Sequence, residues 1–247
     1  MPDAAAYRAK WGVIIPSTNT VVEHDFARLV PHGISFHAGR ALITRPEMTS
    51  DATAKALLDQ MEERFDEAVE QVMTAKPDRL IVAMSAEVIR RGVSEAAEWT
   101  AALAERAGVP VTTGPDAVVA ALRAVGAERI GLVTPYHAES DALTVAYLEA
   151  CGFEVANIIG LQCTSATAIA ETTPERFTEA LRGVDGDDVD ALVQVGTNLS
   201  AIRVAGEAEH WLGKPTIAMN AVTVWWALRE SGFADTIDGF GTVLRDH

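Results

Sequence analysis

GVIIP at residues 12–16, followed by STNT at 17–20, is the stretch that decides the fold. Its apolar residues follow one another without alternation, which is typical of a strand buried on both faces of a parallel sheet. The polar residues after it indicate the loop that leaves such a strand. A similar stretch, GLVTP, recurs at residues 131–135.

Two further stretches recur in the same order. LIVAMS at 80–85 resembles ALVQVGT at 191–197, and AGVPV at 107–111 resembles LGKPT at 212–216. The three separations are each roughly 105–120 residues, which indicates a duplicated unit. The alternative is that any two α/β units look alike at this level.

Strand-like and helix-like stretches alternate along the whole chain. This alternation predicts an α/β protein with two similar lobes, each a parallel sheet flanked by helices. We expect a pseudo-two-fold axis between the lobes, residues 1–114 and 115–220, with residues 221–247 packing back on the first. The expected strands are 11–16, 34–43, 80–84, 109–113, 129–134, 153–160, 191–195 and 215–218. The expected helices are 51–75, 93–107, 115–125, 138–151, 174–183, 200–212 and 221–231.

Composition narrows the class of protein. The chain has 247 residues, a net charge of −15 and 49% hydrophobic residues. An acidic surface repels phosphate backbones and anionic lipids, so we expect neither a nucleic-acid nor a membrane partner. No signal peptide or long apolar run is evident, which favours the cytoplasm. The two cysteines could not by themselves supply the four ligands of a zinc site.

The loops after the expected strands are rich in hydroxyl and amide side chains. Ligands in open parallel sheets bind beyond the carboxyl ends of the strands, so two lobes related by a two-fold axis would share one site. Ser, Thr and Asn beside free helix N–H groups are suited to binding a carboxylate. Each cluster alone could instead be an ordinary helix N-cap. Together they predict a small anionic substrate held between the lobes.

The motifs also resemble those of a known family. GVIIPSTNTVVE at 12–23, TPY at 134–136, GTNL at 196–199 and the stretch from GKP at 213–215 to Asn220 are similar to motifs of maleate cis-trans isomerases and arylmalonate decarboxylases. These enzymes form one branch of the aspartate/glutamate racemase superfamily. The resemblance implies an enzyme without cofactor or metal, in which cysteines from the two lobes perform the chemistry. It places the family's substrate-binding asparagine and tyrosine at Asn19 and Tyr136.

The chain departs from the family where the two cysteines are expected. Met84 occupies the first position and Gly196 the second, and neither side chain can transfer a proton. Cys151 and Cys163 lie elsewhere, and we interpret Cys151 as a packing residue and Cys163 as a packing or surface residue. The resemblance, so modified, gives the following candidates. Catalysis is assigned to Ser85, Glu87 and Tyr136, and substrate binding to Ser17, Asn19, Met84, Gly196, Thr197 and Asn198.

Glu87 is the new ionisable group at this site. Burial in the cleft would raise its pKa and suit it to proton transfer, whereas pairing with Arg90 or Arg91 would make it structural. His137 is a further titratable candidate, or simply a solvated loop residue. Arg40 and Arg45 are candidates to clamp a second carboxylate.

Several functions are compatible with these residues. The leading hypothesis is a cofactor-independent isomerase, similar to maleate isomerase or a racemase, that acts on a small mono- or dicarboxylate without cysteine. A decarboxylase, or a hydrolase of a small carboxylate or lactam, is an alternative. A non-catalytic carboxylate-binding protein is another. The apolar stretch with Val222, Trp225, Trp226 and Leu228 could pack the lobes together or join subunits, and we expect a homo-oligomer.

Overall fold

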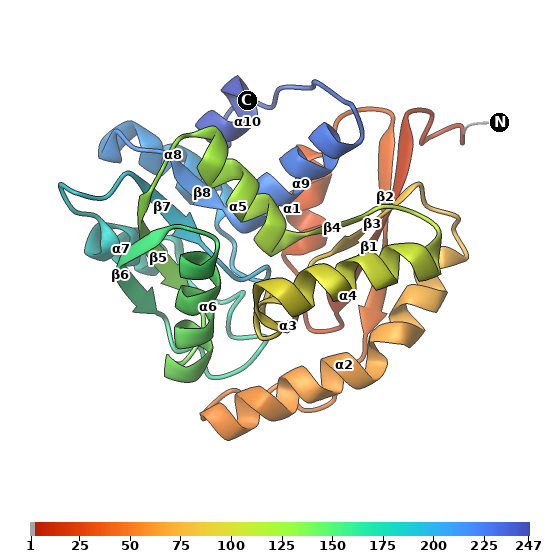
Figure 1. The fold of residues 1–247 in the computed structure, drawn as a ribbon, viewed down its shortest axis with the longest axis horizontal. Helices are drawn as coiled ribbons and strands as arrows, with labels where there is room; N and C mark the ends of the chain where they lie inside the picture. The colour runs from red at the N-terminus through yellow and green to blue at the C-terminus, as the bar shows by residue number, and fades with distance from the viewer. Residues whose placement is uncertain (1–2) are drawn as a thin grey trace.

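The computed structural model describes residues 3–247 and contains two parallel sheets with helices around them (Figure 1). The strands of the first lobe are β1 (Ala9–Pro16), β2 (Ile34–Ala41), β3 (Arg79–Val82) and β4 (Val111–Thr113), and those of the second are β5 (Arg129–Thr134), β6 (Glu154–Gly160), β7 (Ala191–Gln194) and β8 (Thr216–Ala218). The helices are α1 (Val22–Leu29), α2 (Asp51–Met73), α3 (Ser85–Ile89), α4 (Gly92–Ala107), α5 (Gly114–Ala124), α6 (Ala138–Ala150), α7 (Pro174–Val184), α8 (Ile202–Leu212), α9 (Met219–Glu230) and α10 (Thr242–Asp246).

The two sheets have the same topology. The strand order is β2-β1-β3-β4 in one and β6-β5-β7-β8 in the other, and every pairing is parallel. The equivalence of β1 with β5 and of β3 with β7 is the one that the sequence repeats predict. The predicted fold class is therefore confirmed. Within residues 3–247, no helix has the length and apolar character needed to cross a membrane.

Three short helices were not predicted. α1 begins where the Asn19 side chain accepts hydrogen bonds from the N–H groups of Val21 and Val22, at 3.0 and 2.9 Å. An asparagine that caps a helix from two or three residues upstream looks like part of a loop in the sequence. α3 and α10 span five residues each, which is too short for a helical pattern of apolar residues.

α9 begins directly after the carboxyl end of β8 and contacts elements of both lobes. It packs against α5, α1, β4 and β8. Val222, Trp225 and Leu228 of α9 are buried within the chain, and Trp226 is half-buried. These contacts agree with packing between lobes, the first of the two roles considered for this stretch. The division at residues 114 and 220 remains our proposal.

Glycines allow helices to approach the central strands closely. A Cβ atom at Gly131 of β5 would lie 2.4 Å from the carbonyl oxygen of Val184, and one at Gly39 of β2 would lie 2.3 Å from that of Ala68. Backbone oxygens in packed helices cannot move aside as a flexible side chain can. Gly131 therefore fixes the distance between β5 and α7.

We expect Gly131→Ala to destabilise the protein by on the order of 1–3 kcal/mol, the usual cost of overpacking a core. Gly183→Ala on α7 is the matched control, because its new methyl would meet the flexible end of Ile159. Urea unfolding of both variants measures the difference. Equal stability of G131A and the wild type would show that the two elements can separate at little cost.

A buried carboxylate lies between the lobes. Asp25 of α1 is fully buried and accepts a hydrogen bond of 2.8 Å from Asn220 Nδ2, and His24 Nδ1 lies 3.2 Å from its other oxygen. Burial raises the pKa of Asp25 above its usual value, and the contacts with Asn220 and His24 oppose the rise. The folded state consequently holds a proton on Asp25 more tightly than the unfolded state does.

We expect Asp25→Asn to gain stability relative to the wild type as the pH rises. The wild type loses stability as the pH rises from the unfolded-state pKa through the higher folded-state pKa, whereas asparagine carries no such proton. Urea unfolding of both proteins at about pH 4.5 and about pH 7.5 tests this. A stability difference that is the same at both pH values would contradict the raised pKa.

Candidate functional site

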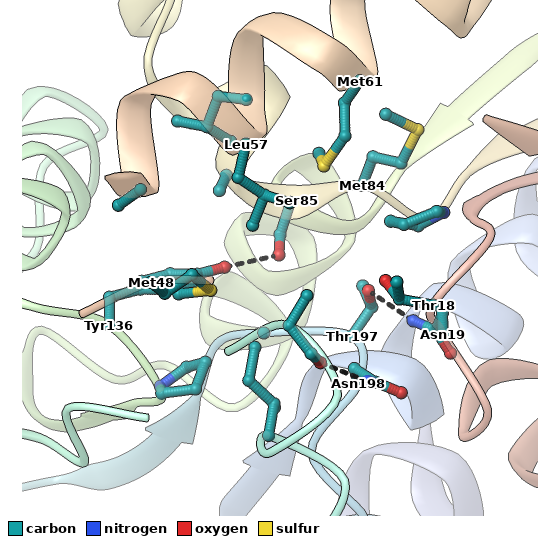
Figure 2. Close-up of a pocket in the computed structure, with 18 of the residues that line it drawn as sticks. Thr18, Asn19, Met48, Leu57, Met61, Met84, Ser85, Tyr136, Thr197 and Asn198 are labelled. Atoms are coloured by element: carbon teal, nitrogen blue, oxygen red, sulfur yellow. Dashed lines mark hydrogen bonds between the residues drawn. The ribbon is translucent and has the colours of Figure 1, made fainter. Parts of the chain in front are cut away.

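A pocket opens between the lobes at the carboxyl ends of the strands (Figure 2). Loops after β1 and β3 of the first lobe, and after β5 and β7 of the second, supply its polar wall. The amino-terminal half of α2 supplies much of the opposite wall. The lining residues are Pro16, Thr18, Asn19, Met48, Ala54, Leu57, Leu58, Met61, Met84, Ser85, Ala86, Pro135, Tyr136, Ser140, Ala166, Ile169, Gly196, Thr197 and Asn198.

Ser85 and Tyr136 form a hydroxyl pair at one side of the pocket. Their oxygens are 2.9 Å apart, and the pair joins the two lobes (Figure 2). Burial raises the pKa of Tyr136 to about 12, although the bond to Ser85 opposes the rise. The backbone N–H of Tyr136 donates to Thr134 Oγ1 at 3.1 Å, and that hydroxyl donates to Asp141. The phenol is thus held in place and protonated at neutral pH.

Asn19, Thr197 and Asn198 form the other polar side (Figure 2). Asn19 Nδ2 donates to Thr197 Oγ1 at 3.2 Å, and Thr197 Oγ1 donates to the carbonyl of Ala83 at 3.0 Å. Asn198 accepts from the N–H of Thr20 at 3.0 Å. These bonds also cross between the lobes, so the side chains predicted to bind substrate hold the walls of the pocket in register as well.

Backbone donors remain available in the same wall. Among residues 3–247, no acceptor completes a hydrogen bond with the N–H of Gly196, Thr197 or Asn198. On the facing wall, Ser85 and Ala86 open α3, and the first N–H groups of a helix have no intrahelical acceptor. Free N–H groups on two facing walls are suited to the oxygens of a carboxylate or of an enediolate.

The backbone at Gly196 explains why no side chain stands there. Its φ is +118°, a conformation that side chains disfavour. A Cβ at this position would also lie 2.7 Å from the Cδ and Cγ atoms of Pro135. A cysteine at 196 would require the loop and Pro135 to move.

The apolar wall was missed in the sequence. Leu57, Leu58 and Met61 lie on α2, a helix that we predicted over residues 51–75 without assigning any of its residues to the site. Met48 comes from the loop after β2, and Ile169 from the loop after β6. These two loops pair in antiparallel fashion, with Met48 N donating to Thr164 O at 2.8 Å and Ala166 N to Pro46 O at 2.7 Å. Sequence gives no signal for such a contact between loops of different lobes.

Glu87 does not face this pocket, contrary to its predicted position. Its side chain is 1% exposed and points to the other side of α3, where it accepts hydrogen bonds of 2.9 Å from Arg90 and 2.8 Å from Arg91. Burial raises its pKa, and the bonds and charge of the arginines oppose the rise. The structural alternative, pairing with arginine, therefore describes Glu87, and its side chain is not placed to reach a substrate in this pocket.

Ser17 and three further candidates also lie outside the pocket lining. Ser17 Oγ accepts the N–H of Ile43 at 2.9 Å and so holds the loop after β2. Arg40 donates to the carbonyls of Ser17 and Asn19 and pairs with Glu23. His137 Nε2 contacts the carbonyl of Cys163 at 3.1 Å, and Arg45 is not among the lining residues.

Both cysteines are packing residues by position. Cys151 ends α6, and Cys163 is buried 3.8 Å from Thr172 Oγ1. Burial raises the pKa of each thiol. Neither lines the pocket, and Met84 lines it at the position where the family resemblance places a cysteine. In the described part of the chain, no three His, Cys, Asp or Glu side chains are grouped to hold a metal ion.

Charged side chains are absent from the pocket lining, as drawn from residues 3–247. Tyr136 is the one lining side chain that titrates at all, since the others are apolar, hydroxyl or amide groups. The predicted residues that do line the pocket are Asn19, Met84, Ser85, Tyr136, Gly196, Thr197 and Asn198. Thr18 and Ser140 add hydroxyl groups that the sequence analysis did not single out.

Comparison with known proteins places this geometry in a family. A sequence profile for arylmalonate decarboxylase matches residues 11–244. The chain is 27% identical to a maleate isomerase of Nocardia farcinica, with 95% of this chain and 94% of that one covered. It is 24% identical to an arylmalonate decarboxylase of Bordetella bronchiseptica, with 94% and 95% covered.

Solved structures agree with the sequence comparison. A variant of the Nocardia farcinica maleate cis-trans isomerase, solved with a covalently bound succinylcysteine intermediate, superposes with a TM-score of 0.87 at 27% identity and covers 97% of this chain and 99% of its own. A structure of arylmalonate decarboxylase with a TM-score of 0.77 and 22% identity shares the fold, with 95% of this chain and 98% of that chain covered. The chain belongs to the arylmalonate decarboxylase family, whose members similar to it are isomerases and decarboxylases of small acids.

Proposed function

We propose that this chain decarboxylates a small malonate-type acid bearing an apolar substituent, without using a thiol. The observation that carries the proposal is the pocket lining, which combines the Ser85–Tyr136 hydroxyl pair and free backbone N–H groups with an apolar wall. The family supplies isomerisation and decarboxylation as the two reactions to weigh.

Decarboxylation needs less from the side chains than isomerisation does. Adding a nucleophile to a double bond requires an activated thiol or hydroxyl, and racemisation requires two groups that exchange protons. The pocket lining holds no cysteine, histidine, lysine or carboxylate to provide either. Loss of CO₂ leaves its own electron pair behind and requires no base. This favours decarboxylation over the isomerase reaction that we ranked first from sequence.

The reaction can be written with the groups present. The bond between the α-carbon and one carboxylate breaks, CO₂ leaves, and the electron pair forms an enediolate with the remaining carboxylate. The N–H groups of Gly196, Thr197 and Asn198 would stabilise the enediolate oxygens. Tyr136 donates its proton to the α-carbon, the Ser85 hydroxyl stabilises the resulting tyrosinate by a hydrogen bond, and a water molecule then returns a proton to Tyr136 and leaves as hydroxide.

The apolar wall defines the rest of the substrate. Met48, Leu57, Leu58 and Met61 can surround a hydrocarbon substituent. They also place the departing carboxylate in surroundings that stabilise neutral CO₂ better than an anion. A compact dicarboxylate such as maleate would leave this wall unused.

One observation favours a second candidate function. The pocket lining holds no group that ionises near neutral pH, which equally suits a protein that binds a carboxylate without transforming it. Hydrolysis is less well supported, because Glu87, the residue proposed to activate water, faces away from the pocket.

We expect the purified protein to release CO₂ from phenylmalonate or ethylmalonate, and proton NMR in D₂O would show one deuterium at the α-carbon of the product. Tyr136→Phe should lower kcat at least about 100-fold, the usual effect of losing a positioned acid. Thiol-blocking reagents should have no effect on turnover. Binding of either acid without turnover would favour the binding protein, and sensitivity to the reagents would implicate a cysteine.

We expect kcat to stay level from about pH 6 to about pH 10, because the donor must be protonated and the pKa of Tyr136 is raised to about 12. A thiol donor, with an ordinary pKa near 8.5, would make kcat fall within this range. Initial rates across the range, with circular dichroism as a check on folding, provide the measurement. A decline centred near pH 8–9 in folded protein would exclude Tyr136 as the donor.

A further inference from the structure

Glu87 is the buried centre of an ionic network on the far side of α3, whose other members are partly exposed. Arg90 Nε and Nη2 contact its two carboxylate oxygens at 2.9 Å each, and Arg91 Nη2 contacts it at 2.8 Å. A carboxylate held in this forked arrangement by planar guanidinium groups has little freedom to move. The carboxylate is 1% exposed, so water competes little for these bonds.

The network joins α3 to α2. Both arginines also contact Glu62, and Arg90 lies 3.8 Å from Asp59, so two acidic residues of α2 hold the arginines that hold Glu87. The residues directly before these two acids, Leu58 and Met61, line the pocket. One set of ion pairs therefore couples the apolar wall of the pocket to α3.

α3 needs such support. It has five residues, and Met84 at its N-cap makes no side-chain hydrogen bond to it. A helix of this length is not stable by itself, because most of its N–H and C=O groups lack intrahelical partners. Ser85 is its first residue and Glu87 its third. The position of the Ser85 hydroxyl therefore depends on what holds the rest of the helix.

We propose that Glu87 is a positioning residue that, through Arg90 and Arg91, holds α3 so that Ser85 stays hydrogen-bonded to Tyr136. Its relevance to turnover rests on the proposed proton transfer by the Ser85–Tyr136 pair. Glu87 touches no substrate in this arrangement, and its effect reaches the pocket through Ser85. In the Met-Ser-Ala-Glu motif at 84–87, Ser85 then lines the pocket and Glu87 holds Ser85 in position.

The test measures the chemical shift of the Tyr136 phenol by NMR. The chain has three tyrosines, so a protein labelled with ¹³C at the tyrosine ζ-carbon gives three signals, and Tyr136→Phe identifies the relevant one. Ser85→Ala should shift the Tyr136 signal by removing its hydrogen bond. Glu87→Gln should shift it in the same direction. In the Ser85→Ala background, Glu87→Gln should add no further shift.

The matched control is Glu95→Gln, which makes the same chemical change in an exposed partner of Arg91, 3.4 Å away. It should leave the Tyr136 signal unchanged. If Glu87→Gln does not fold, Arg90→Lys keeps the charge but loses the forked grip on Glu87 and should give the shift instead. Unchanged signals for Tyr7 and Tyr147 show that the fold is intact. An unshifted Tyr136 signal in folded E87Q or R90K would overturn the proposal.

Steady-state kinetics provide a second, independent test of the role proposed for Glu87. With phenylmalonate as substrate, Glu87→Gln should lower kcat about tenfold with little change in KM, as expected for an interaction that matters in the transition state. Adding it to Ser85→Ala should cost nothing further. If the protein proves inactive, the ¹³C shifts still decide whether Glu87 positions Ser85. Additive losses in kcat would show that Glu87 acts by a route other than Ser85.

Discussion

The hydrogen bond between Ser85 and Tyr136 is the interaction on which the site depends, because it joins a short helix of one lobe to a loop of the other. Both residues follow the carboxyl end of a strand, β3 for Ser85 and β5 for Tyr136. Parallel sheets with the same strand order bring these ends face to face. On the other side of the pocket, Thr197 after β7 accepts a bond from Asn19 after β1. The pseudo-symmetric fold thus provides cross-lobe hydrogen bonds on both sides of one cavity.

The sequence was sufficient for the architecture and for most of the polar wall. Buried parallel strands have continuous apolar runs, and the loops after them are where ligands bind, so the repeated stretches predicted Ser85 and Thr197 as site candidates. Tyr136 followed from the resemblance to the family. The sequence did not predict which side chains face the pocket where this depends on the orientation of a short helix about its axis. Ser85 and Glu87 lie two residues apart on α3, and only one of them can face the pocket. The apolar residues of α2 posed the same difficulty, since a stripe that lines a cavity and a stripe that fills a core have the same period.

The absence of thiols from the pocket is connected with other features of the chain. Gly196 has a positive φ and lies against Pro135, so the loop is adapted to a residue without a side chain. Met84 lines the pocket with a thioether, which packs against apolar groups and cannot carry a proton. Ser85 and Tyr136 remain as the hydroxyl pair. The glycine-specific backbone at 196 and the proposed anchoring of Ser85 by Glu87 both suit a site that works without a thiol.

The charge distribution bears on the choice of reaction. A pocket without lysine, arginine or histidine in its lining binds a dianion poorly, because neutral donors offset only part of the cost of removing two charges from water. In the proposed reaction, the loss of CO₂ moves the charge of the departing carboxylate onto the enediolate oxygens beside the backbone N–H groups. Proton transfer from Tyr136 to the α-carbon then leaves a product with a single negative charge. Isomerisation of a dicarboxylate keeps both charges in the pocket throughout. The same low polarity that makes the pocket unfavourable for two carboxylates therefore lowers the barrier to expelling one of them, provided that backbone N–H groups hold the other.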